Sequence, residues 1–316
     1  MASPAPTAAG RRFARSRHFP LFLLLTGAVI YGLAYSLFKM GTTAGIPFIP
    51  FVFWQTTGAA LALGLILLLR RRPPKIGWPH VRLYLLLGIL GFAIPGAIFA
   101  FVAPKIPAGI LSLAVTLEAG LTYLLALTLV MERFNWVRLT GLLLGLAGVL
   151  LIVLPEASLP SRTMVIWVLI CFGTPLLFAV QDVLIERFWP VGGTSLQISS
   201  GALATASLFM LPVMAASDSW WFFEGPMDSG DWALIGLIAI NAVGVWVFLE
   251  MIRLAGAVFA STVTYLETLS GVAWGMVIFN ERHSAWIWAA LALLLAGIFF
   301  INRTARHHVT RHHGTP

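Results

Sequence analysis

Two glutamates in long apolar segments are the residues of this chain whose position could support chemistry. Glu118 lies near the middle of residues 111–133 (LSLAVTLEAGLTYLLALTLVMER), and Glu267 lies near the middle of residues 260–282 (ASTVTYLETLSGVAWGMVIFNER). At 1.5 Å per residue each lies roughly 16 Å into its segment, about half of a ~30 Å hydrocarbon core. A carboxylate at that depth costs at least ~2.5 kcal/mol unless it is paired or protonated. Each glutamate could therefore recognise a cation, exchange a proton, or bond to a neighbouring helix as a purely structural group.

The same polar residues recur at a fixed offset of 149 positions, from 118 to 267, from 132 to 281 and from 133 to 282. Because the 316 residues include only 12 Asp and Glu, chance rarely produces three such matches. The pattern indicates an internal duplication with one buried carboxylate in each half. The repeated Glu-Arg pairs lie in short hairpins, where the glutamate can interact with a helix N-terminus, and we interpret them as structural.

The composition predicts an all-α integral membrane protein. The chain is 59% hydrophobic and 10% charged, with a mean hydropathy of +0.92, whereas soluble domains are roughly 25% charged. The basic residues lie between apolar runs and at the termini, which favours a role in membrane topology over nucleic-acid binding. Cys171 is the single cysteine, so an intramolecular disulfide or a cysteine-based metal site is excluded. No phosphate-binding loop, metal-ligand cluster or nucleophile–base pair is visible, so we expect no cofactor, no metal and no enzyme activity.

The apolar runs divide the chain into ten predicted transmembrane helices, because a span needs about 20 apolar residues and its backbone must bond internally. The predicted spans lie near residues 20–38, 48–69, 82–102, 107–130, 136–154, 164–184, 195–215, 232–252, 257–279 and 284–302.

These spans predict two five-helix repeats of opposite orientation in the membrane, since a repeat with an odd number of spans must be inverted when it recurs. The expected organisation is a basic cytoplasmic tail (1–19), a first repeat (20–154), an external linker (155–163), a second repeat (164–302) and a cytoplasmic His-rich tail (303–316). Most of the 20 Lys and Arg fall in segments that lie inside if the N-terminus is cytoplasmic. We therefore expect a multi-pass protein of the cell inner membrane with both termini in the cytoplasm.

Other polar and aromatic side chains within the spans could line a pathway, since aromatic groups with a few polar ones suit a recognition pocket. Lys39 ends the first span and could pair with a carboxylate, bind an anionic group of a substrate, or extend to the lipid headgroups. Packing and lipid-facing roles remain open for each of the others. Besides Glu118, Glu267 and Lys39, the candidates for substrate binding or coupling are Tyr35, Trp54, Tyr123, Gln181, Asp182, Asn241, Trp246, Thr264, Tyr265 and Trp274.

The duplicated segments, each an apolar helix with a mid-span glutamate, a Glu-Arg hairpin and a Gly-rich apolar helix, resemble the EamA-type drug/metabolite transporter superfamily. The resemblance covers nearly the whole chain and implies a ten-helix exporter with a central cavity between the repeats. It also implies amino acids or related metabolites as substrates and an alternating-access mechanism. Ala119 and Thr268 stand where family members often have a proline, so we expect less kinked helices; Gln55 stands where many have an arginine.

The sequence thus predicts a secondary transporter that exports a small metabolite, amino acids being the favoured class, with protons as a candidate coupling ion. Two alternatives stay open. The first is an uncoupled facilitator of the same fold in which the glutamates are structural. The second is a lipid-handling protein or a membrane-embedded enzyme.

Overall fold

The computed structural model describes residues 19–131, 134–154, 159–223, 226–255 and 263–303. These residues form helices and no strand. The helical elements are α2 (Phe19–Thr43), α3 (Phe48–Leu69), α4 (Trp78–Leu87), η1 (Gly88–Ala93), α5 (Ile94–Val102), η2 (Ala103–Lys105), α6 (Ala108–Val115), α7 (Glu118–Thr128), α8 (Trp136–Val153), α9 (Met164–Cys171), α10 (Gly173–Phe188), α11 (Ser195–Ala216), α12 (Ser229–Ala255), α14 (Val263–Phe279) and α15 (Ala285–Arg303).

Six helical stretches among the described residues are long and apolar enough to cross a membrane, and shorter apolar helices accompany them. The six are Phe48–Leu69, Trp78–Lys105, Ala108–Thr128, Met164–Phe188, Ser195–Ala216 and Ser229–Ile252. Helices satisfy their own backbone hydrogen bonds, which the hydrocarbon core of a bilayer requires. The chain is therefore a multi-pass membrane protein with an all-α fold, as its composition predicts.

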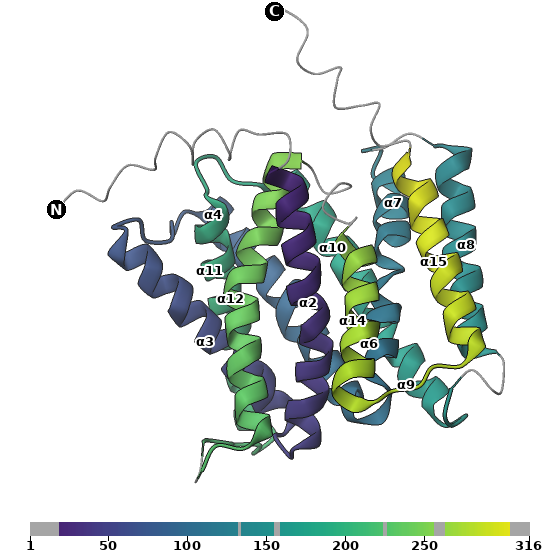
Figure 1. The fold of residues 1–316 in the computed structure, drawn as a ribbon. Coiled ribbons are helices and arrows are strands. Elements are labelled where there is room, and N and C mark those ends of the chain that lie inside the picture. Colours follow the sequence, from purple (N-terminus) through teal and green to yellow (C-terminus); the bar gives the residue numbers. More distant parts are fainter. Residues whose placement is uncertain (1–18, 132–133, 155–158, 224–225, 256–262, 304–316) are drawn as a thin grey trace, which may run out of the picture.

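The helices pack into one bundle in which the two halves of the chain interleave (Figure 1). In the contacts between halves, α8 packs along α15, α6 along α14, and α3 along α11. Helix α2 of the first half packs against α14 and α12 of the second half. In the same way, α10 of the second half packs against α7 and against α4 and α5 of the first half. Helix α2 begins and α15 ends at the same end of the bundle, which we call the terminal end (Figure 1). The opposite end, where α2 ends and α15 begins, is called the far end.

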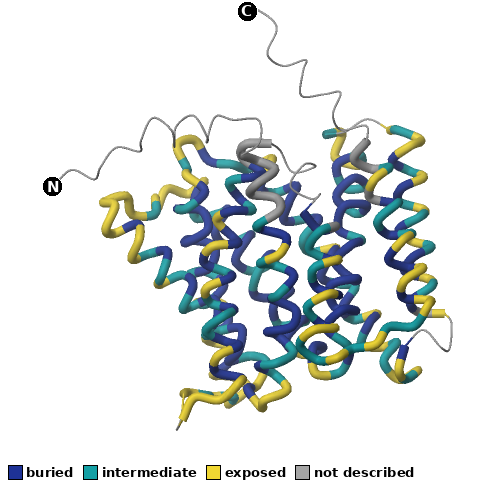
Figure 2. The backbone as a smooth tube through the Cα atoms, viewed as in Figure 1, coloured by how far each residue is buried: buried dark blue, intermediate teal, exposed yellow. Residues whose placement is uncertain are grey.

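The buried residues lie at the centre of the bundle, whereas exposed and half-buried residues follow its outer helices (Figure 2). Exposed leucines include Leu61, Leu65 and Leu68 on α3 and Leu143 and Leu146 on α8. Large apolar side chains on an outer surface are unfavourable in water and match a lipid environment.

Two of the long helical stretches, Trp78–Lys105 and Ala108–Thr128, are interrupted along their length. Residues Gly88–Ala93 form a π-helical segment, and Pro95 follows it in α5. Local π geometry of this kind is frequent at functional sites because it re-aims side chains. The helix pair α6 and α7 is broken at Thr116 and Leu117, just before Glu118. The expectation of a less kinked helix is wrong at this position, because the helix breaks without the proline that Ala119 replaces.

Candidate functional site

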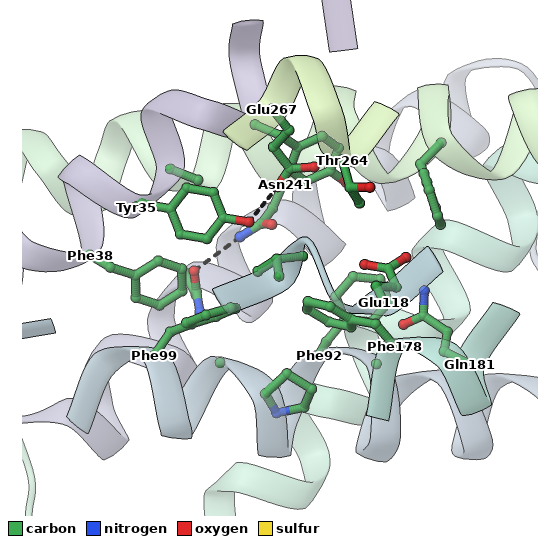
Figure 3. Close-up of a pocket in the computed structure, with 18 of the residues that line it drawn as sticks. Tyr35, Phe38, Phe92, Phe99, Glu118, Phe178, Gln181, Asn241, Thr264 and Glu267 are labelled. Atoms are coloured by element: carbon green, nitrogen blue, oxygen red, sulfur yellow. Dashed lines mark hydrogen bonds between the residues drawn. The ribbon is translucent and has the colours of Figure 1, made fainter. Parts of the chain in front are cut away.

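A cavity lies between the two halves of the chain and receives side chains from α2, α3, η1, α5, α6, α7, α10, α12 and α14 (Figure 3). It holds about 860 Å3 of space not filled by atoms, including the part open to the outside. Along the bundle, the lining runs from Phe38 near the end of α2 to Phe248 in α12 and Thr264 in the first turn of α14. The lining therefore covers the middle of the bundle.

Glu267 lines the cavity from α14 and is held by a tyrosine of the other half. The Tyr35 hydroxyl on α2 donates a hydrogen bond of 2.5 Å to Glu267 Oε1 (Figure 3). Tyr35 is buried, and its ring meets Phe99 edge-on with 5.5 Å between the centroids. The packing of Tyr35 thus fixes the donor, and the donor orients the Glu267 carboxylate toward the cavity.

Glu118 lines the same cavity as the first residue of α7 and is buried. Its carboxyl group lies within hydrogen-bonding reach of the Asp182 carboxyl group on α10, which is fully buried. Thr122 Oγ1 donates a hydrogen bond of 3.5 Å to Asp182 Oδ2, while Asp182 Oδ1 has no donor among the described residues. Two ionised carboxylates only accept hydrogen bonds and repel each other, so this buried pair requires a shared proton or a bound cation.

Two buried amides complete the polar lining. Asn241 Nδ2 on α12 donates a hydrogen bond of 3.0 Å to Gln55 Oε1 on α3, again across the halves (Figure 3). Gln181 is 6% exposed, and its Oε1 has no donor among the described residues. This amide lies against Gly91 of the π-helical segment, where a Cβ would come within 1.7 Å of Gln181 Oε1. Glycine at position 91 therefore makes room for the Gln181 amide.

Aromatic rings form the rest of the wall and close the cavity toward the far end. Figure 3 shows Phe92, Phe99 and Phe178 facing the same space as the two glutamates. Phe38 packs against Phe99 at 5.8 Å and against Phe51 at 5.7 Å between centroids. These contacts separate the cavity from the far end of the bundle.

A second polar cluster, the Glu281 cluster, lies beyond these rings at the far end. Glu281 Oε1 accepts hydrogen bonds from Lys39 Nζ at 2.9 Å and from Ala108 N at 2.6 Å, and Oε2 accepts one from Gly109 N at 3.0 Å. A carboxylate at a helix N-terminus is stabilised by the free N–H groups and the helix dipole. The Glu-Arg hairpin was predicted to interact with a helix N-terminus, and the helix it reaches is α6 of the other half. The equivalent Glu132 lies outside the described residues.

His283 packs beside this cluster, in the loop between α14 and α15 and outside the membrane-spanning segments. Its side chain is 2% exposed, and His283 Nε2 lies 3.7 Å from Glu281 Oε2. Burial lowers the pKa of His283 below its ordinary value of 6.5, nearby Glu281 raises it, and Lys39 lowers it. The net direction is downward, which favours the neutral imidazole.

The structure brings six of the predicted site residues into the cavity lining and places Asp182 directly behind Glu118. The six are Tyr35, Glu118, Gln181, Asn241, Thr264 and Glu267. Lys39 is not in the lining but in the Glu281 cluster. Of Tyr265, only the backbone falls within the described residues.

The remaining four candidates lie elsewhere. Trp54 Nε1 donates a hydrogen bond of 2.9 Å to the carbonyl oxygen of Trp221, in the segment before α12. The Tyr123 hydroxyl accepts a hydrogen bond of 2.8 Å from Asn135 N and so links α7 to the start of α8. Trp274 Nε1 donates to a backbone carbonyl of α2, and Trp246 is 38% exposed outside the cavity. These contacts account for the first three side chains as packing groups.

Sequence reasoning did not single out the phenylalanines of the wall. They are Phe38, Phe92, Phe99, Phe178 and Phe248. A phenylalanine that faces a cavity and one that faces lipid look alike in an apolar segment. The available signal was the Gly91–Phe92 and Pro95–Gly96 pattern, since Gly and Pro interrupt helices that line transport sites.

The fold and site together define a multi-pass membrane protein with a polar and aromatic cavity enclosed by helices of both halves. Comparison with protein-family models gives a match to the EamA-like transporter family over residues 18–154 and again over residues 165–303. The chain belongs to this family, and the resemblance noted in its sequence is confirmed. The two matched regions also show that the family unit occurs twice in the chain.

Two individual proteins are similar to the chain. A protein of Saccharomyces cerevisiae described as an uncharacterized membrane protein is 24% identical in an alignment of 259 positions, and the match covers 72% of this chain. The chain spans 58% of the length of that relative. A crystal structure superimposes with a TM-score of 0.63 at 19% identity and covers 92% of this chain and 99% of its own chain. At that identity the likeness shows a shared fold.

Proposed function

We propose that the protein is a secondary transporter that exports small metabolites, amino acids or related compounds, by alternating access through the central cavity. The observation that carries the proposal is the origin of the lining: α2, α3, α5 and α7 of the first half and α10, α12 and α14 of the second half enclose one polar-and-aromatic cavity. A site at the interface of two repeats becomes accessible from alternate sides when the repeats rock against each other.

Two inverted five-helix repeats are part of this proposal. We assign ten spans to α2, α3, α4–η2, α6–α7, α8, α9–α10, α11, α12, α14 and α15. The organisation is that of the sequence prediction, with repeats at 20–154 and 164–302. The paired contacts between halves support a two-fold relation, because the contacts of α2 with α14 and α12 recur for α10 with α7, α4 and α5.

The proposed location is the cell inner membrane, with both termini in the cytoplasm, and it rests on the distribution of Lys and Arg. The terminal end of the bundle then faces the cytoplasm and the far end faces outside. In this orientation Phe38, Phe99 and the Glu281 cluster lie between the cavity and the outer side. The arrangement supports an inward-facing state that is ready to load a substrate for export.

Proton coupling is the proposed energy source because Glu118 and Glu267 lie in the cavity and Asp182 lies behind Glu118. A buried carboxylate must be protonated or paired with a cation. An exporter can use this requirement by exchanging protons for the substrate. An uncoupled facilitator would instead keep the same protonation state while the substrate crosses.

The test is transport by the purified protein in proteoliposomes loaded with labelled amino acids and the corresponding amines. The proposal predicts saturable, protein-dependent movement of at least one of them, with accumulation against its gradient when a pH gradient is imposed. Movement that only equalises concentrations identifies a facilitator. Absence of any movement, together with lipid retained by the purified protein, would favour the lipid-handling alternative.

A further inference from the structure

We infer that the cavity is built for an organic amine: a substrate with a positively charged nitrogen, a hydrophobic or aromatic body and no carboxylate. The inference rests on the proposed transport function and names the substrate class of the same cavity. It narrows the range of amino acids and related compounds to their amine members.

The charges of the lining are of one sign. Glu118 and Glu267 face the cavity, and Asp182 adds a third acidic group behind the wall. None of the described lining residues is a Lys, Arg or His. Lys39, the candidate for an anionic group of a substrate, bonds to Glu281 at the far end. A positively charged ligand therefore finds partners in this cavity, whereas a ligand carboxylate would be buried without a basic side chain to pair with it.

The hydrogen-bonding groups match a donor-rich head group. An ammonium has donors only, and each carboxylate oxygen of the cavity is an acceptor. Gln181 adds Oε1, a buried acceptor in the cavity wall that has no donor among the described residues. The hydrogen bond from Asn241 Nδ2 to Gln55 Oε1 uses one amide N–H, and the amide N–H groups that remain are neutral, so they do not neutralise a ligand carboxylate.

The aromatic wall provides the second half of the recognition. Phe92, Phe99 and Phe178 line the same cavity as Glu118 and Glu267 (Figure 3), and Tyr31 and Tyr35 also line it. Aromatic faces attract a cation within about 6 Å, and this attraction strengthens when water is excluded. The same rings bury the apolar body of the ligand. A single cavity therefore serves the charge and the body of an amphipathic amine together.

The experiment compares three probes that share a benzene ring and differ in charge: phenylethylamine carries an ammonium, phenylalanine is a zwitterion, and 3-phenylpropionate carries a carboxylate. Binding to the purified wild-type protein is measured by titration calorimetry and by the rise in thermal stability that binding to the folded state produces. We expect phenylethylamine to bind at least about tenfold more tightly than phenylalanine, and 3-phenylpropionate not to bind. Equal or tighter binding of phenylalanine, binding of 3-phenylpropionate, or binding of none of the three overturns the inference.

Variants locate the binding site. Glu267→Gln and Glu118→Gln are expected to weaken phenylethylamine binding at least about tenfold, because each loses a charged acceptor. The control is Asp218→Asn, which removes an exposed carboxylate outside the cavity at a positive φ that asparagine also adopts. It should leave binding unchanged. Unchanged binding in both Glu variants overturns the assignment, and the wild-type comparison remains decisive if a variant does not fold.

Transport of the same probes separates this inference from the proposed function. If phenylalanine is transported and phenylethylamine is neither bound nor transported, the transport function holds and the amine class is overturned. If phenylethylamine binds selectively but none of the probes crosses the membrane, the amine site holds and the transport function fails.

Discussion

The Glu281 cluster predicts that Glu281→Gln opens the far end of the bundle. In the structure the carboxylate bonds to Ala108 N at 2.6 Å, to Gly109 N at 3.0 Å and to Lys39 Nζ at 2.9 Å. It thereby ties the loop after α14 to α2 and α6 of the other half. If the halves rock, these bonds exist only while this end is closed, so their loss raises the free energy of the closed state alone and favours the open state.

The size of the effect follows from these contacts. Glutamine keeps the shape, but its amide oxygen replaces only one acceptor and its NH2 group faces the second backbone donor. Loss of one hydrogen bond to a charged group costs about 1.5–3 kcal/mol. The Lys39 side chain is 20% exposed, so its ion pair adds only about 0.2–1 kcal/mol. The total of about 2–4 kcal/mol corresponds to a shift of roughly 30-fold to several hundred-fold toward the open state.

Site-directed labelling measures this shift. The buried native cysteine of α9, Cys171, is first replaced by alanine. A single cysteine is then introduced by Phe38→Cys, because Phe38 lies at the far-end limit of the cavity. A membrane-impermeant maleimide is then added from the far-end side of sealed vesicles. Glu281→Gln should accelerate labelling by the factor given above. Asp228→Asn is the matched control and should leave the rate unchanged. Among the described residues the Asp228 carboxylate accepts bonds from Gly230 N and Asp231 N at the start of its own helix and from no residue of the other half. An unchanged rate in Glu281→Gln would refute the reasoning.

Three further predictions concern packing and local electrostatics. Gly297→Ala should lower the free energy of unfolding by about 1–3 kcal/mol, because the new Cβ would lie 2.5 Å from a backbone carbonyl oxygen of α8. Gly145→Ala is the control and should have little effect, since its Cβ would meet only one atom, at 3.9 Å. Equal melting temperatures for the two variants would contradict this prediction. Tyr35→Phe should destabilise the ligand-free protein by about 1.5–3 kcal/mol through loss of the bond to Glu267, and an unaltered melting temperature would exclude that role. Burial lowers the pKa of His283 in the folded state, so as the pH falls the unfolded chain takes up a proton on His283 at a higher pH than the folded chain does. The contribution of His283 to stability should therefore be complete above pH 6.5 and should decrease as the pH drops from 6.5 toward the folded pKa. His283→Gln should reduce that acid-side loss in pH-dependent melting curves, and an identical profile would contradict the assignment.

Much of the architecture could be predicted because membrane helices are encoded locally. Apolar runs of sufficient length define spans, and helix α3 begins and ends at the predicted residues 48–69. Glu118 and Glu267 could be singled out because a carboxylate in an apolar segment is rare and expensive. Their common cavity is a feature of the structure, whereas their role in transport remains a prediction.

Other parts of the site depend on contacts that no local pattern contains. Glu281 bonds to residues more than 170 positions away, so its partner helix cannot be read from the hairpin that carries it. The break before Glu118 arises without a proline, through a turn at Thr116 and Leu117. Trp54 and Trp274 share the chemistry of cavity residues, but their indole N–H groups bond to backbone carbonyls elsewhere. Only tertiary packing separates these cases.

The central claim is that the carboxylates of the cavity take part in coupling or recognition. It is tested most directly by transport in proteoliposomes across a range of pH, comparing the wild-type protein with Glu118→Gln and Glu267→Gln. Tyr31, Tyr35 and Asp182 face these two carboxylates and are left intact. The account predicts that at least one variant folds, yet loses accumulation driven by a pH gradient or loses the pH dependence of its rate. Two folded variants with the wild-type rate and the wild-type pH profile would contradict it.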